Sequence, residues 1–268
     1  MRNVSLKNST LNLLDEGSGP PLLLVHGFPL DHSVWRHQIA HFSQTHRVLA
    51  PDLRGFGQSG PLSDMATMRD FADDLADLLA AIGETRPVIF CGLSMGGYIA
   101  WQFVLNYRSK LAALIVCDSL ATADAPEPAR GRLVAAERLE KEGNNAFLVE
   151  SMLPRLFGEK LLSESPEFVT TTKQIMLSTS AKTCAAAQRG MAERSDMANL
   201  LPLIDLPTLI LCGETDIIAP TAKMREIAAA IPGAVYAEIA GAGHMAPLEK
   251  PVEVNAAIEK FLGAVKNN

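Results

Sequence analysis

Short runs of apolar residues alternate with longer amphipathic stretches along most of the chain. Five such runs lie at residues 21–26, 47–50, 87–91, 111–117 and 207–212. They are continuously apolar rather than alternating, which is typical of strands buried on both faces of a parallel sheet. Residues 68–82 instead space their apolar side chains at helical intervals and place acidic residues opposite. Strands that alternate with helices predict an α/β fold built from right-handed crossovers.

The two ends of the chain extend this pattern. Residues 4–6 and 11–14, followed by Asp15-Glu-Gly-Ser-Gly, predict an antiparallel hairpin ahead of the first parallel strand. Residues 235–239 predict the last strand, and residues 252–262 predict the last helix. We therefore expect a mostly parallel central sheet that is flanked by helices.

The alternation stops between residues 121 and 201. Prolines and glycines divide this stretch into four segments of helical character, at 129–142, 146–157, 166–177 and 182–194. The pattern offers no strand candidate among them. It predicts an all-helical cap inserted after the sixth strand. The cap domain is expected at 121–200, and the core domain at 1–120 and 201–268.

The composition narrows the class of protein. Hydrophobic residues make up 48% of the 268 residues and charged residues 20%, which excludes intrinsic disorder. A net charge of −6 makes nucleic acid and membrane surfaces poor partners. We find no apolar run near the roughly 18 residues of a membrane-spanning helix. The first residues also lack the apolar segment of a secretory signal, so we expect a cytoplasmic protein.

The four cysteines do not form a metal or redox motif. Cys91, Cys117 and Cys212 each close a short apolar run, where cysteine behaves as a small buried hydrophobe, and Cys184 lies in an Ala-rich segment. Without a C-x-x-C pair, zinc and thioredoxin-type sites are excluded, and we expect reduced thiols.

The clearest chemical signal is Gly92-Leu-Ser94-Met-Gly96, directly after an apolar run and before a predicted helix at 98–107. Glycines on either side allow the tight strand-to-helix turn that holds a serine hydroxyl exposed. The helix N-terminus supplies amide donors and positive dipole for a developing oxyanion. Ser94 is therefore the predicted nucleophile.

A serine nucleophile needs a base, and His244 is placed to provide one. It lies in the Gly-rich loop Gly241-Ala-Gly-His-Met-Ala-Pro, between the last strand and the last helix. Such loops lie at the carboxyl edge of the sheet, where ligands bind in these folds. The polar helical region holds His32, His37, His41 and His46, which we expect to be solvated.

The base needs an acid that orients its ring. Asp216 follows the apolar run at 207–212 and is the first choice. Asp118, which follows the run at 111–117, and Glu214 are alternatives.

An oxyanion hole needs two amide donors. One is expected from Met95, the residue after the nucleophile, and the other from Phe28 in the loop after the third strand. Gly27 would let that loop approach the serine, and Pro29 would fix the backbone behind Phe28. His26 is expected to hold the loop rather than act as a second base.

Five blocks of sequence together resemble the α/β-hydrolase superfamily: HGFPLDHSVW, APDLRGFGQS, GLSMGGY, GETDIIAP and GAGHMAPLEKP. The whole chain is most similar to the capped, short-chain cytoplasmic carboxylesterases of that superfamily. It is also similar to 3-oxoadipate enol-lactonases and to the non-metal haloperoxidase or perhydrolase group. The order Ser94, Asp216, His244 is that of the superfamily's triad. The resemblance implies that residues 52–59 form a structural turn, so no chemical role is expected for Asp52 or Arg54.

These residues predict a serine carboxylesterase that works through an acyl-enzyme and needs no metal or organic cofactor. Alternatives are enol-lactone or C–C bond hydrolysis, a perhydrolase side activity, and a slowly turning-over signalling protein that binds a ligand. An inward-facing cap arginine would favour a substrate with a carboxylate; the candidates are Arg130, Arg155 and Arg189. The expected partner is a small-molecule ester, and the protein is expected to be a monomer or small homo-oligomer.

Bulky apolar residues in the cap and the strand loops predict a small apolar chamber. The residues expected to contact the substrate are Leu30, Met152, Leu156, Ile217 and Met245. Such a chamber favours esters with short acyl chains, from about acetate to butyrate.

Overall fold

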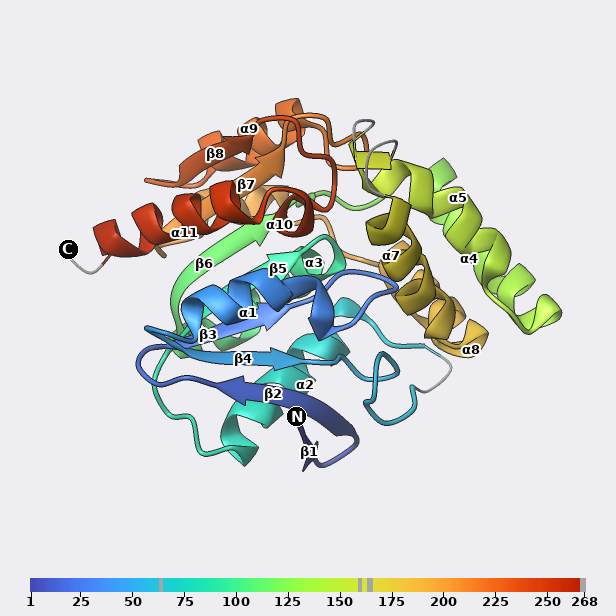
Figure 1. Cartoon of the computed structure of the whole chain (residues 1–268), viewed down its shortest axis with the longest axis horizontal. Helices are drawn as coiled ribbons and strands as arrows, with labels where there is room; N and C mark the ends of the chain where they lie inside the picture. The colour runs from blue at the N-terminus through green and yellow to red at the C-terminus, as the bar shows by residue number, and fades with distance from the viewer. Residues whose placement is uncertain (63–64, 159–160, 163–165, 266–268) are drawn as a thin grey trace.

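The computed structural model describes residues 1–62, 65–158, 161–162 and 166–265. Within these residues, eight strands form one sheet in the order β1-β2-β4-β3-β5-β6-β7-β8 (Figure 1). The strands are β1 (Arg2–Ser5), β2 (Thr10–Glu16), β3 (Pro21–Val25), β4 (Arg47–Pro51), β5 (Val88–Leu93), β6 (Leu111–Cys117), β7 (Thr208–Gly213) and β8 (Val235–Ile239). β1 and β2 pair antiparallel with their neighbours, and every pairing among β3 to β8 is parallel. The predicted hairpin and mostly parallel sheet are confirmed.

Helices cover both faces of the sheet. On one face lie α1 (Arg36–Phe42) and α11 (Pro251–Val265), and on the other lie α2 (Met68–Ala81), α3 (Met95–Tyr107) and α9 (Thr221–Ala230). In β3, Leu22 and Leu24 pack with the first group of helices, whereas Leu23 and Val25 pack with the second. Successive side chains of a strand point to opposite faces, so a strand covered on both faces is apolar throughout. This explains the continuous apolar runs of the sequence.

Further helices connect β6 to β7 and lie beyond the carboxyl ends of the parallel strands (Figure 1). They are α4 (Pro126–Glu142), α5 (Ala146–Leu156), α7 (Pro166–Ser178), α8 (Ala181–Ala192) and the 3-10 helix η3 (Ala198–Leu203). The four predicted cap segments are thus helical. Helix α4 begins three residues earlier than predicted, because Pro126 takes the first helical position, where proline is favoured. We propose residues 121–200 as the cap domain.

Close packing joins α8 to the rest of the protein. Ala185, Ala186 and Ala187 are fully buried, and short side chains of this kind let neighbouring helices approach. A Cβ atom on Gly190 would lie 1.8 Å from the carbonyl oxygen of Ala66. The Ala-rich segment around Cys184 is therefore a packing surface between the cap helices and the core.

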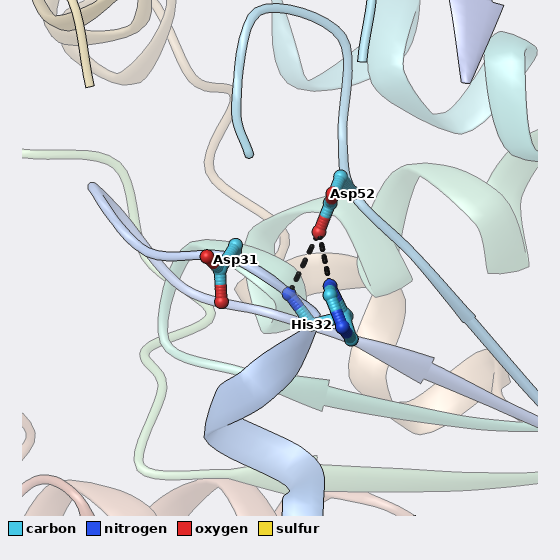
Figure 2. Close-up of side chains that lie close together, drawn as sticks. All are labelled: Asp31, His32 and Asp52. Carbon is cyan, nitrogen blue, oxygen red and sulfur yellow. Dashed lines mark hydrogen bonds and ion pairs between the residues drawn. The ribbon is translucent and has the colours of Figure 1, made fainter. Parts of the chain in front are cut away.

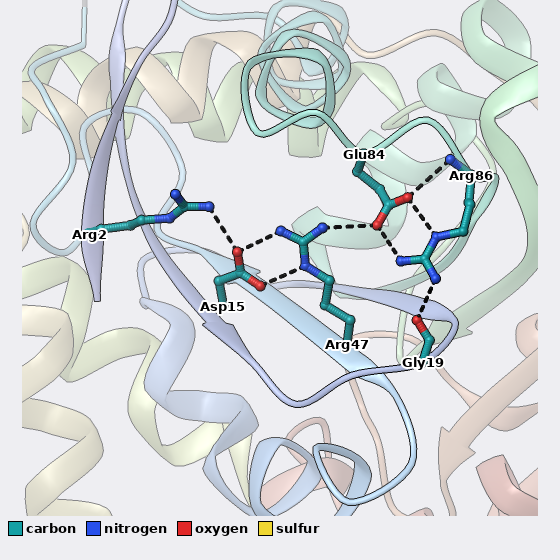
Figure 3. A network of polar contacts seen from close by, with 6 residues as sticks. All are labelled: Arg2, Asp15, Gly19, Arg47, Glu84 and Arg86. Carbon is teal, nitrogen blue, oxygen red and sulfur yellow. Dashed lines mark hydrogen bonds and ion pairs between the residues drawn. The ribbon is translucent and has the colours of Figure 1, made fainter.

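A network of charged residues ties together the edge of the sheet where the parallel strands begin (Figure 3). The Arg47 guanidinium donates to both carboxylate oxygens of Asp15, at 2.8 and 2.7 Å, and to Glu84 at 3.0 Å. Arg86 also binds Glu84, and Arg2 binds Asp15. This edge is opposite to the one where the strands end, so the network stabilises the fold away from the candidate site.

Four histidines were expected to be solvated. His46 is instead buried, and His32 is only partly exposed. His46 is only 4% exposed, because its ring packs edge-on against Phe42 and its Nδ1 lies 2.8 Å from the Thr45 hydroxyl. His32 is half-buried and bonded to Asp52. Position in a polar stretch does not reveal which side chains the fold turns inward.

All four cysteines are buried, as the apolar runs predicted for Cys91, Cys117 and Cys212. None of the helices in the described part of the chain is long and apolar enough to cross a bilayer.

Candidate active site

Ser94 lies on a strained turn between β5 and α3. Its backbone has φ 53° and ψ −112°, in the region that non-glycine residues rarely adopt. A Cβ atom on Gly92 would lie 2.3 Å from the carbonyl oxygen of Gly96, and one on Gly96 would lie 2.3 Å from that of Val25. Both positions therefore require glycine. The backbone amide of Ser94 donates to the Cys117 carbonyl at 3.0 Å, which holds the turn to β6.

Ser94, His244 and Asp216 form one chain of hydrogen bonds. The Oγ of Ser94 lies 2.8 Å from Nε2 of His244, and Nδ1 of His244 lies 2.8 Å from Oδ2 of Asp216. An ionised carboxylate can only accept, so Nδ1 of the neutral ring is the donor to Asp216. Nε2 is then the acceptor for the Ser94 hydroxyl. This tautomer leaves the imidazole ready to remove the serine proton.

Asp216 is held as a carboxylate. Burial by itself raises the pKa of its carboxyl, but the charge and hydrogen bond of His244 and the amides of Ala219 and Ile218 lower the pKa below its usual value. Those amides donate to Oδ1 at 3.0 and 2.7 Å, so Oδ2 faces His244 alone.

The two alternative acids lie elsewhere. Oδ1 of Asp118 accepts from the Gly213 amide at 2.7 Å, and its Oδ2 is buried with no hydrogen-bond partner among the described residues. Burial, together with the negative charge of Asp216, raises the pKa of Asp118 well above its usual value. Glu214 accepts from the Gly241 amide at 2.8 Å near the surface. Neither carboxylate is hydrogen-bonded to His244.

Glu249, which the sequence analysis missed, braces the histidine loop. It ends the short helix α10 (Ala246–Glu249). Its Oε1 accepts from the amides of Gly243 and Met245, at 2.9 and 3.2 Å, which flank His244. Its Oε2 accepts from the Gly158 amide, just after α5, at 2.8 Å. One buried carboxylate therefore joins the histidine loop to the end of a cap helix.

Ser119 is a second residue that the sequence analysis missed. Its hydroxyl donates to the carbonyl of Ser94 at 2.7 Å, and a Cβ atom on Gly97 would lie 2.4 Å from its side chain. This hydrogen bond stabilises the turn at Ser94. No sequence signal marks it, because serine after a strand is common.

The loop expected to complete an oxyanion hole lies beside Ser94. A Cβ atom on Gly27 would lie 3.2 Å from both the Leu93 carbonyl and Cβ of Ser94. Phe28 follows in this loop and is buried against Phe56. Met95 is the first residue of α3, where backbone amides lack partners within the helix. The two predicted donors are thus on the segments that border the serine.

His26 holds this loop in place. Its Nε2 accepts from the Leu53 amide and its Nδ1 lies 2.9 Å from the Gly27 carbonyl, so both ring nitrogens are engaged. Burial lowers its pKa and keeps the ring neutral. These contacts fit a structural role.

Asp31, His32 and Asp52 bring three potential metal ligands within 4.8 Å of one another, in the part of the chain that the structure describes (Figure 2). Their atoms are already engaged with each other and with the backbone. Oδ1 of Asp52 accepts from the His32 amide at 3.0 Å and lies 2.6 Å from its Nδ1. Asp31 caps the 3-10 helix η1 (His32–Trp35) by accepting from the Ser33 amide. These hydrogen bonds indicate that Asp31, His32 and Asp52 stabilise a turn of the backbone.

Asp52 is the centre of that turn. Its Oδ2 accepts from the Asn12 side chain at 3.1 Å and from the Gln58 amide at 3.0 Å. Arg54 forms an ion pair with Asp74 on α2. Asp52 and Arg54 therefore both make contacts that stabilise the fold.

A cavity of about 480 Å³ lies between the cap helices and α3. Its wall includes Met152 from α5, Tyr98 from α3 and Ile218, two residues after Asp216. It also includes the charged residues Asp124, Arg132, Arg155 and Arg194. The cavity is thus more polar than the apolar chamber expected from the sequence.

The structure brings only one of the five predicted substrate contacts to this wall, Met152. Leu30, Leu156 and Met245 are each about 1% exposed and pack in the apolar cluster between the cap helices and the sheet. Ile217 is 63% exposed. An apolar side chain near the site can serve packing as well as binding, and its residue type does not distinguish the two.

Comparison with known proteins places this site in a family. The sequence model of the alpha/beta hydrolase fold family matches residues 20–251. The solved structure of a thermophilic esterase from Thermogutta terrifontis, with malate bound, is 42% identical over 98% of both chains, with a TM-score of 0.95. The enol-lactonase from Burkholderia xenovorans LB400 is 27% identical over 98% of this chain and 100% of its own, with a TM-score of 0.90. Among curated proteins, 3-oxoadipate enol-lactonase 1 from Acinetobacter baylyi is 28% identical over 250 residues, 93% of this chain and 90% of its own. The chain therefore belongs to the alpha/beta hydrolase fold family and is a hydrolase.

Proposed function

We propose that the protein is a serine carboxylesterase that hydrolyses small carboxylic esters through an acyl-enzyme. The observation that carries this is the hydrogen-bond chain from Ser94 through His244 to Asp216, at 2.8 Å for each link. The similarity to a thermophilic esterase supports it. We also propose that the enzyme is cytoplasmic, because four buried free cysteines suit a reducing compartment.

In the proposed reaction, His244 removes the Ser94 proton as Oγ attacks the ester carbonyl. The amides of Phe28 and Met95 stabilise the oxyanion of the tetrahedral intermediate. His244 then gives the proton to the leaving alkoxide, so an alcohol departs and the acyl group stays on Ser94. Water, deprotonated by His244, repeats the attack and releases the acid. Asp216 holds the imidazole in the required tautomer throughout and stabilises its charged form.

The test combines covalent labelling with turnover. Phenylmethylsulfonyl fluoride should add once to the wild-type protein, as measured by intact mass, and the Ser94→Ala variant should neither take the label nor hydrolyse esters. Ser119→Ala is the matched control, because this neighbouring hydroxyl donates to a carbonyl rather than to a base. It should still be labelled. Label on a residue other than Ser94, or a fully active Ser94→Ala variant, contradicts the proposal.

A second candidate function is hydrolysis of enol-lactones. It is favoured by the similarity to enol-lactonases and by Arg155 on the cavity wall, which could hold a substrate carboxylate. A panel of esters, lactones and amides separates the candidates by kcat/KM. Very slow turnover of every substrate would instead favour a ligand-binding role.

A further inference from the structure

The cavity beside the candidate active site carries a surplus of positive charge. Among its wall residues, three are arginines, Arg132, Arg155 and Arg194, and one is an acid, Asp124. The wall therefore has a formal excess of two positive charges. This is the reverse of the protein as a whole, whose net charge is −6. The local charge is a property of this cavity and not of the surface in general.

Part of this charge is buried. The Arg194 side chain is 4% exposed, that of Asp124 is 10% exposed and that of Arg132 is 24% exposed. Both guanidiniums approach the same carboxylate oxygen, Oδ2 of Asp124, at 2.7 Å from Arg194 and 2.6 Å from Arg132. One carboxylate cannot neutralise two guanidiniums. A buried charge without a counter-charge is costly, so an anion entering the cavity would be stabilised there.

The arginines are held in place before any ligand binds. The Arg194 guanidinium lies 4.3 Å from the centre of the Tyr98 ring, and its Nε donates to the Thr122 carbonyl at 3.1 Å. Nη1 of Arg132 donates to the Gln188 side chain at 3.2 Å. These contacts and the Asp124 ion pairs use Nε and Nη1. Among the described residues, Nη2 of each guanidinium has no hydrogen-bond partner, so both keep donors for a ligand.

The cavity adjoins the catalytic groups through three wall residues. Tyr98 lies one helical turn after Ser94 on α3, and helical side chains lean toward the N-terminus of their helix. The amide of Ile218 donates to Asp216. Leu120 follows Ser119, which supports the serine turn. An ester group at Ser94 could therefore extend its far end into this cavity.

We propose that the cavity binds a carboxylate carried by the substrate, so that the preferred substrates are monoesters or lactones of dicarboxylic acids. This inference rests on the proposed function and deepens it by naming the substrate class. Arg155 approaches from α5 on the exposed side of the cavity and is the guanidinium that an incoming carboxylate meets. Guanidinium and carboxylate form bidentate, charge-assisted hydrogen bonds, which suits this recognition.

The test compares two esters that differ only at one end. Monoethyl glutarate carries a carboxylate where ethyl pentanoate carries a methyl group, and ethanol release reports hydrolysis of both. The measured quantity is the ratio of kcat/KM for monoethyl glutarate to that for ethyl pentanoate. We expect Arg155→Gln to lower this ratio about tenfold or more, because a charged pair is lost. Arg155 is exposed, so the variant should fold.

Two further variants sharpen the outcome. Arg130→Gln removes an exposed arginine of α4 that is absent from the wall, and should keep the wild-type ratio within about twofold. Asp124→Asn removes the carboxylate that competes for Arg132 and Arg194, and should raise the ratio. A ratio that is equal in the wild type, Arg155→Gln and Asp124→Asn overturns the inference.

A binding measurement separates this inference from the proposed function. Glutarate is titrated calorimetrically into the Ser94→Ala variant and into the Ser94→Ala, Arg155→Gln double variant, in a buffer free of other carboxylates and of phosphate. We expect binding to the first and at least about tenfold weaker binding to the second. If neither ethyl ester is hydrolysed but this difference is found, the proposed function fails and the anion site stands. If ethyl pentanoate is hydrolysed but glutarate does not bind, the anion site is wrong and the esterase stands.

Discussion

Oε1 of Glu249 lies 2.9 Å from the backbone nitrogen of Gly243, the residue directly before His244. The same carboxylate binds the amide on the other side of the histidine and, through Oε2, the amide of Gly158. The position of His244 is therefore coupled to the end of a cap helix. The Met245 amide also donates to the carbonyl of Leu156, the last residue of α5, at 3.1 Å, so the Glu249 side chain and this backbone bond together link α5 to the histidine loop.

Glu249→Gln should lower kcat about tenfold while leaving the fold intact. The substitution replaces one acceptor oxygen with an NH2 group, so at least one buried backbone N–H loses its acceptor, at a cost of about 1–3 kcal/mol. Steady-state kinetics with a p-nitrophenyl ester, together with the unfolding midpoint in urea, measures both effects. Glu253→Gln, on the exposed side of α11, is the control and should change neither. If Glu249→Gln has the wild-type kcat, the hydrogen bonds of Glu249 to Gly243 and Met245 do not position His244.

Asp216→Asn and Asp118→Asn should differ by orders of magnitude in activity. Asparagine at 216 presents an NH2 group to Nδ1 and favours the wrong tautomer, which in a serine protease lowers kcat on the order of 10⁴. Burial and the charge of Asp216 raise the pKa of Asp118, which disfavours its charged form, and asparagine is a neutral residue of nearly the same size. Its left-handed backbone, with φ 48°, also tolerates asparagine. A single ester assayed with both variants is sufficient, and the reverse ranking would place the acid at the end of β6.

Acyl chain length should show an optimum at short chains, from about acetate to butyrate. Each methylene that fits gains about 0.8 kcal/mol, but a cavity of about 480 Å³ limits how many can fit. The measurement is kcat/KM for p-nitrophenyl esters of increasing acyl length. Met152→Ala should move the optimum to longer chains because it enlarges the wall, whereas Leu133→Ala, exposed on α4, should not. A maximum at palmitate would contradict this interpretation of the cavity.

The His32–Asp52 pair should stabilise the protein most in mildly acidic solution. Burial opposes the charge on His32, but the hydrogen bond and charge of Asp52 raise its pKa. Stability from His32 is thus complete below the unfolded pKa of about 6.5 and is lost as the pH rises through the higher folded pKa. Burial also opposes the charge on Asp52, but His32 and backbone amides lower its pKa, so its contribution is lost only as the pH falls below about 4.

Urea unfolding of the wild type and His32→Gln measures this effect, since glutamine keeps a donor without a charge. We expect the difference in unfolding free energy to be about 1 kcal/mol between about pH 4 and pH 6.5, and to shrink above neutrality. His41→Gln removes a histidine from an exposed pair with Glu259 and should have little effect at any pH. A difference that grows toward high pH would falsify the assignment of the charge to His32.

The fold could be predicted from the sequence because its signals are local. A continuously apolar segment such as 21–26 can be stable only where both faces are covered, and the helical spacing at 68–82 defines a face for burial. The turn at Ser94 could be predicted equally well, because Gly92 and Gly96 lie two residues from Ser94 and only glycine fits at these positions. Residues close in sequence constrain one another through the backbone, whatever the rest of the chain does.

Only the tertiary structure determined which residues stabilise the candidate active site and which charged residues line the cavity. Glu249 and Gly158 are 91 positions apart in the chain, and Asp118 and Gly213 are 95 apart. A single sequence carries no record of such pairings. Residue type did not separate Leu30, which packs in the core, from Met152, which borders the cavity, because both environments favour apolar side chains. Likewise, an arginine is solvated in most settings, and only the packing of the cap over α3 brought Arg132, Arg155 and Arg194 to the wall of one cavity.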